Sequence, residues 1–193
     1  QTSTGYSLAM KDLQLRGSGS ILGDIQSGFI ANVGLNIFNK YVIDSIEGKS
    51  EDKSSILETE IKLDCYWGSS IPKSYIDADS ERIDIYKRLE HSEPIKVDEI
   101  KNEIIDRFGN VPEITDNLFS TAKIRSILQK KEILRCKIRE FQVELFPVDL
   151  TEDLKLSIEK YDKRFIFRNK RLVLNFQHSL TPESTYELLD SIL

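Results

Sequence analysis

The residues best suited to chemistry lie together near the start of the chain, in the segment DLQLRGSGSILGDIQSG at positions 12–28. Arg16 and Gln26 stand there among four glycines. Glycine permits positive φ and close backbone approach but loses much entropy on folding. The segment therefore favours a sharply turned backbone that presents polar groups. If Asp12 and Arg16 share one helical face, the carboxylate can orient the guanidinium. The alternative is a glycine-rich connector that only packs tightly.

Standard phosphate and nucleophile motifs do not fit this part of the chain. The glycines at 17–23 have the wrong spacing for a dinucleotide-binding loop. Residues 48–50 (Gly-Lys-Ser) resemble the end of a phosphate loop, but Ile43 occupies the position of the required first glycine. Residues 27–28 lack the Gly-x-Ser-x-Gly elbow of hydrolases. None of these patterns predicts a catalytic centre.

The remaining reactive residue types are few or scattered. Cys65 and Cys136 are far apart in sequence, and we expect two reduced thiols partly in the core. His91 and His178 do not stand at metal-ligand spacing from a cysteine. We therefore expect no metal site. Paired carboxylates lack the apolar surroundings that would raise a pKa for acid–base work; these are Asp77 with Glu81, Glu99 with Glu103, and Glu152 with Asp153.

The charge is uneven along the chain. The net charge of −5 argues against a free-standing nucleic-acid binder. Residues 123–139 nevertheless contain seven basic residues against one acidic residue, Glu132, and residues 163–171 contain five basic residues. Each cluster is either a solvated face or a surface for a partner or for DNA. No apolar run reaches the roughly 18 to 20 residues that span a bilayer, and no secretory signal is visible. We expect a cytoplasmic protein with no membrane partner.

The elements that must position these residues change in style after residue 48. A helical stripe runs from about Ile30 or Asn32 to Ile46, and the polar residues 47–55 follow as a linker. Period-2 alternation then predicts a strand over 61–67. Further along, Ser80 is expected to cap a helix that runs to about 90, and Gly109 to end a helical stripe over 97–108 in the left-handed conformation. Pro112 opens a long helix, a hairpin follows over 134–145, and Thr151 caps a short helix. The last expected elements are a hairpin over 165–176 that turns at 169–170 and a helix over 182–192.

This order predicts an α+β fold, with an N-terminal helical segment followed by a compact domain that has a small, mainly antiparallel sheet and several helices. The expected division is residues 1–48, a linker at 49–56, and a second domain at 57–193. The chain starts at Gln1 inside an ongoing pattern, so we expect it to be a piece of a longer protein.

Segment 12–28 resembles the translocation motif shared by bacterial transcription-repair coupling factors and the helicase RecG. On that resemblance, Arg16 matches the motif's arginine and Gln26 its glutamine. The framework positions are matched by Asp12, Gly17, Gly19, Gly23 and Gly28. Ser18 departs from the pattern, because RecG-like versions usually have proline there and coupling factors alanine. The motif's earlier arginine would precede Gln1.

Two later stretches resemble only the coupling factors. They are IPKSYIDADSERIDIYKRL at 71–89 and EIIDRFGNVPEITDNL at 103–118, and RecG ends without such a domain. The resemblance extends from Gly5 to about Ile133. From the residues alone, Tyr75, Arg82 and Tyr86 either maintain the fold or contact a partner, and fold maintenance is the simpler expectation.

The resemblance implies the carboxy-terminal part of an ATP-driven duplex DNA translocase that releases stalled RNA polymerase and recruits the excision-repair protein UvrA. It implies ATP and magnesium in the parent protein, but the chain has no Walker loop, so we expect no cofactor and no ATP hydrolysis here. It also implies an autoinhibitory terminal domain that docks on a module resembling UvrB. The alternative function is a DNA-contacting accessory module that uses the basic clusters at 123–139 and 163–171.

Overall fold

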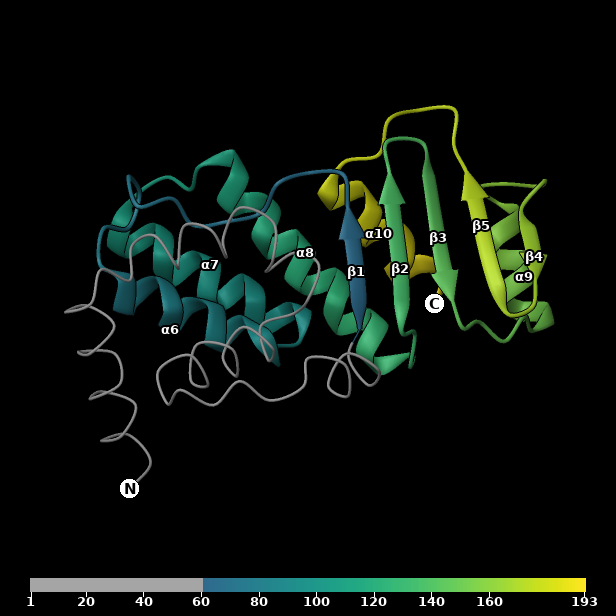
Figure 1. Ribbon diagram of the computed structural model, residues 1–193, viewed down its shortest axis with the longest axis horizontal. Helices are drawn as coiled ribbons and strands as arrows, with labels where there is room; N and C mark the ends of the chain where they lie inside the picture. Colours follow the sequence, from purple (N-terminus) through teal and green to yellow (C-terminus); the bar gives the residue numbers. More distant parts are fainter. Residues whose placement is uncertain (1–60) are drawn as a thin grey trace, which may run out of the picture.

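The computed structural model describes residues 61–193. The expected helix over 30–46, the linker at 49–56, the start of the second domain at 57 and all of segment 12–28 lie outside the described residues. Within them, the chain forms five helices and a five-stranded sheet (Figure 1). The predicted α+β class is confirmed.

The sheet has the strand order β1-β2-β3-β5-β4. Its strands are β1 (Lys62–Cys65), β2 (Arg135–Arg139), β3 (Gln142–Phe146), β4 (Ile166–Arg168) and β5 (Arg171–Asn175). The two predicted hairpins are present as antiparallel pairs, whereas β1 joins the edge parallel to β2. A parallel neighbour needs a long crossover, and three helices supply it here.

The crossover helices are α6 (Asp79–Glu90), α7 (Pro94–Phe108) and α8 (Glu113–Lys130). Gly109 ends α7 at φ +84°, ψ −162°, so its φ is positive as expected but its ψ is not that of a left-handed helical stop. Ser80 was expected to cap α6. Ala78 stands at that position instead, without a side-chain hydrogen bond, and Ser80 lies in the first turn.

Helices α9 (Glu152–Glu159) and α10 (Pro182–Ile192) follow the two hairpins. Thr151 accepts a hydrogen bond from the backbone N–H of Leu154 at 3.2 Å, as its predicted role at the start of α9 requires. Thr181 and Ser184 form a reciprocal capping box at the start of α10. Both helices therefore begin where the local sequence signals indicated.

Two hydrophobic cores share α8. Leu118, Phe119 and Ala122 pack with α6 and α7, whereas Ile124 and Leu128 pack with the sheet, α9 and α10. In Figure 1, α8 runs from the helical part to behind β1. One continuous helix thus joins the three-helix part to the sheet.

Buried polar groups fasten the segment after β1 to α8. The indole N–H of Trp67 donates to Thr121 Oγ1 at 2.9 Å, and Ser69 Oγ lies 3.1 Å from the same oxygen. The Asn117 amide donates to the Gly68 carbonyl at 3.1 Å. Because buried polar groups are costly unless paired, these bonds fix the path from the sheet to the helices.

Candidate functional site

The residues expected to couple a motor to movement are not described by the structure. Asp12, Arg16 and Gln26 and the framework glycines at 17, 19, 23 and 28 all precede residue 61. Their roles therefore stay predictions. The sites that the structure does describe belong to the later stretches and to the sheet.

Arg82 and Tyr86 maintain the fold, as expected. The Arg82 side chain is 3% exposed, donates to the Ile76 carbonyl at 2.7 Å and forms an ion pair with Asp79. The Tyr86 hydroxyl accepts a hydrogen bond from the backbone N–H of Ile71 at 2.8 Å, and burial raises the pKa of this phenol. Both side chains hold segment 71–78 against α6, so neither is available to a partner.

Tyr75 closes the same segment from the other end. Its hydroxyl donates to the Gly109 carbonyl at 2.8 Å, and its ring meets Phe108 edge-on at 6.3 Å between centroids. The tyrosine thereby ties the segment to the end of α7. Tyr75, Arg82 and Tyr86 thus all serve the local order of stretch 71–89.

The described titratable groups form no acid–base or thiol site. The hydrogen bond from Arg88 is the main cause that lowers the pKa of Glu103, in the direction that keeps this carboxylate ionised. Burial raises the pKa of the Cys65 thiol to about 12 and that of Cys136 well above its ordinary value. Both thiols are free, as expected. Over residues 61–193, no group of three His, Cys, Asp or Glu side chains could hold a metal ion.

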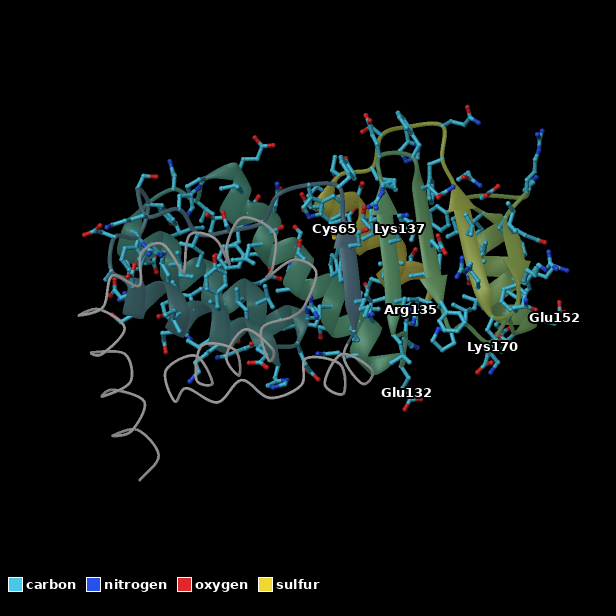
Figure 2. The ribbon with its side chains drawn as sticks, viewed as in Figure 1. Cys65, Glu132, Arg135, Lys137, Glu152 and Lys170 are labelled. Atoms are coloured by element: carbon cyan, nitrogen blue, oxygen red, sulfur yellow. The ribbon has the colours of Figure 1, made fainter. Side chains whose placement is uncertain are left out.

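An open depression of 410 Å³ lies where the lower end of the sheet meets the start of α9. Its lining mixes cations with carboxylates: Lys131 and Lys170 face Glu132, Asp149 and Asp153. Figure 2 shows Glu132, Lys170 and Glu152 around this end of the molecule. Charges of both signs compensate one another here, so the depression has no single electrostatic preference for a ligand.

The structure divides the basic cluster at 123–139 between two environments. Lys123 pairs with Asp98, and its ammonium lies 5.1 Å from the centroid of the Tyr186 ring. Arg125 is buried and lies 3.4 Å from the Ile61 carbonyl. By contrast, Arg135 and Lys137 extend from β2 into solvent (Figure 2). The cluster is therefore not one continuous patch.

The cluster at 163–171 contributes Arg168 and Arg171 to the sheet face that also carries Arg135 and Lys137. Lys62 of β1 lies on this face too, although the sequence reasoning did not single it out. The period-2 alternation of the strands was the signal that could have brought these cations together. No helix of the described residues is long and apolar enough to span a membrane.

Comparison with known proteins adds the following. Residues 67–160 match the TRCF domain family. The chain is 33% identical to a transcription-repair-coupling factor of Bacillus subtilis over 150 residues, and this match covers 72% of this chain and 13% of that protein. The coupling factor of Buchnera aphidicola is 37% identical over 131 residues, which are 65% of this chain and 16% of that protein. The coupling factor of Staphylococcus epidermidis is 30% identical over 162 residues, which are 80% of this chain and 13% of that protein.

A solved structure shares the fold. It is the crystal structure of a C-terminal domain of transcription-repair coupling factor, with a TM-score of 0.58 and 20% identity. The match covers 69% of this chain and 89% of that one. The chain thus spans 13 to 16% of the length of the curated relatives described above.

Proposed function

Because this chain belongs to the transcription-repair coupling factors and carries their carboxy-terminal TRCF domain, we propose that it serves an ATP-driven duplex DNA translocase in two ways. Residues 1–48 couple ATP hydrolysis to translocation. The domain at 57–193 restrains the parent protein by docking on its UvrB-like module and covering the surface for UvrA. Engagement of stalled RNA polymerase releases that restraint.

The observation that carries the regulatory part is the state of the polar side chains in stretch 71–118. Arg82, Tyr86 and Tyr75 all bond within the domain. The pKa of Glu103 is lowered and the pKa values of both thiols are raised, so these groups keep their ordinary charge states near neutral pH. A rigid domain of this kind acts through its surface, which suits docking better than chemistry. The ATP and magnesium of the parent would bind upstream of this chain.

The docking proposal is tested in the full-length parent by ending the chain at residue 56. UvrA binding is measured by surface plasmon resonance for the intact and shortened proteins. Removal of the domain is expected to tighten UvrA binding at least tenfold, since the covering contact is lost. An unchanged affinity refutes autoinhibition by this domain. ATP-dependent DNA translocation of the shortened protein confirms that the motor remains folded.

The coupling proposal rests on the resemblance of segment 12–28. Arg16→Ala in the full-length parent is expected to leave ATP and duplex DNA binding intact while abolishing displacement of stalled polymerase. Lys11→Ala, next to the motif and outside its matched positions, is the matched control. If Arg16→Ala displaces polymerase as fast as the control, Arg16 is a framework residue and not a coupling residue.

A further inference from the structure

Within residues 61–193, no helix packs on one face of the sheet, which we call the open face. Helices α8, α9 and α10 supply the core on the other face, behind the strands in Figure 1. Strand alternation places Leu63, Cys136, Val143, Leu172 and their neighbours on that core face. Every second residue of each strand therefore points to the open side.

A row of cations crosses the open face from edge to edge. Lys62 pairs with Arg135 in the register, and Arg135 with Phe146. The pairing of β3 with β5 ends at Leu145 and Leu172, and Phe146 and Arg171 each stand one residue beyond that pair. Arg171 in turn pairs with Arg168. Four of the five positions are basic. With neighbouring strands about 4.8 Å apart, the row is roughly 19 Å long.

The next rows add no net charge, because Lys137 and Arg139 are matched by Asp64 and Glu144. Lys137 is exposed beside the row. Asp64 pairs with Arg139 at 2.6 Å, and Glu144 with Arg171 at 3.0 Å, so both carboxylates are already neutralised.

Within the described residues, four of these side chains have no carboxylate within ion-pair distance: Lys62, Arg135, Lys137 and Arg168. The face as a whole has six basic and two acidic side chains, in a chain whose net charge is −5. Such a local excess attracts a polyanion.

Phe146 gives the row a second kind of contact. It lies at the middle strand, half-buried, with the Arg135 guanidinium 5.9 Å from its ring centroid. An aromatic ring on an open sheet between cations is the arrangement on which unpaired bases stack while arginine and lysine bind phosphates. A duplex keeps its bases stacked inside, so the ring would add nothing there. An acidic peptide would likewise gain little from it.

We propose that this face binds single-stranded nucleic acid, with phosphates on Lys62, Arg135, Lys137 and Arg168 and one base on Phe146. The proposal is independent of the autoinhibitory docking proposed above. It differs from a module built on linear basic clusters, because it draws on four strands and excludes Lys123 and Arg125.

The test measures fluorescence anisotropy of a labelled 12-nucleotide single strand titrated with the full 193-residue chain. Four phosphate contacts predict a slope of about −2.8 in log affinity against log salt, because each contributes about −0.7. Binding should therefore weaken about 20-fold between 50 and 150 mM KCl. The double variant Arg135→Gln/Arg168→Gln should halve the slope, so that the same salt change weakens binding only about fivefold. The variant Phe146→Leu should weaken binding about tenfold with the slope unchanged.

The double variant Lys73→Gln/Lys96→Gln is the matched control, since it removes two exposed cations from the helical part. It should bind the single strand like the parent chain. The proposal is overturned by any of three results: no binding at 50 mM KCl, equal weakening in the control, or duplex or poly-glutamate binding as tight as the single strand. Circular dichroism of each variant identifies a folding defect, and a misfolded Phe146→Leu is replaced by Phe146→Tyr, which should retain binding.

Discussion

Tyr86→Phe isolates the energetic value of one hydroxyl in the three-helix core. The Tyr86 and Ile71 side chains are fully buried, and the hydroxyl accepts the Ile71 N–H at 2.8 Å. Phenylalanine keeps the ring but leaves that N–H buried without this acceptor. An unsatisfied buried donor costs about 1–3 kcal/mol. At about 2–4 °C per kcal/mol, a loss of about 2 kcal/mol should lower Tm by about 4–8 °C.

The matched control is Tyr161→Phe. Its hydroxyl bonds to Ser191 Oγ at 2.7 Å on the surface, where water replaces it, so a change within about 0.5 kcal/mol is expected. Urea unfolding is followed by circular dichroism and by fluorescence of Trp67, the single tryptophan. Coincident transitions with unchanged m-values establish that the free energies are comparable. Equal effects of the two substitutions would refute the reasoning.

Three further outcomes follow from the turn, an ion pair and a thiol. Lys170→Gly should stabilise the domain by about 1 kcal/mol, because Lys170 has φ +61° and glycine adopts positive φ without strain. The control Lys163→Gly should destabilise the domain. Equal urea midpoints for the two variants would contradict this expectation. Arg88 lowers the pKa of Glu103, so Glu103 stabilises the fold above its unfolded pKa near 4.5, and that contribution disappears as pH falls through the folded pKa. Glu103→Gln should thus lower the free energy of unfolding by under about 1 kcal/mol at pH 7 and leave it unchanged in acid, as measured by urea unfolding at both pH values. A destabilisation that persists in acid contradicts the linkage. With its pKa near 12 instead of 9.0, Cys65 should react with a disulfide reagent at pH 8 about a thousandfold more slowly than in urea-unfolded chain; native rates within tenfold contradict its burial.

Local signals predicted the elements of the described residues closely. The turn at Asn169 and Lys170 has positive φ at both residues, as a two-residue hairpin loop requires. Pro182 after Thr181 located the start of α10. These features depend on neighbours in sequence, so a single sequence contains the necessary information. The prediction that Ser80 caps α6 was wrong, because the start of a helix also depends on tertiary contacts such as the hydrogen bond from Arg82 to the Ile76 carbonyl.

Features made by distant residues could not be predicted in the same way. The parallel pairing of β1 with β2 joins positions about 70 residues apart, and neither strand's pattern specifies its partner. The basic open face of the sheet is likewise made by residues that are distant in sequence. Arg135 and Arg168 belong to separate clusters in sequence, and only the strand order brings them to one face with Lys62. The coupling segment at 12–28 remains a prediction.

The sharing of α8 by the two cores has a consequence for how the domain carries load. A helix of 18 residues is about 27 Å long. Because its first half is embedded among α6 and α7 and its second half under the sheet, a displacement at either end moves the other as part of one rigid lever. We therefore expect the amide hydrogens near its middle, around Ala122, to exchange slowly, as measured by native-state hydrogen exchange. Force applied to the helical end is therefore delivered to the sheet without a hinge between them.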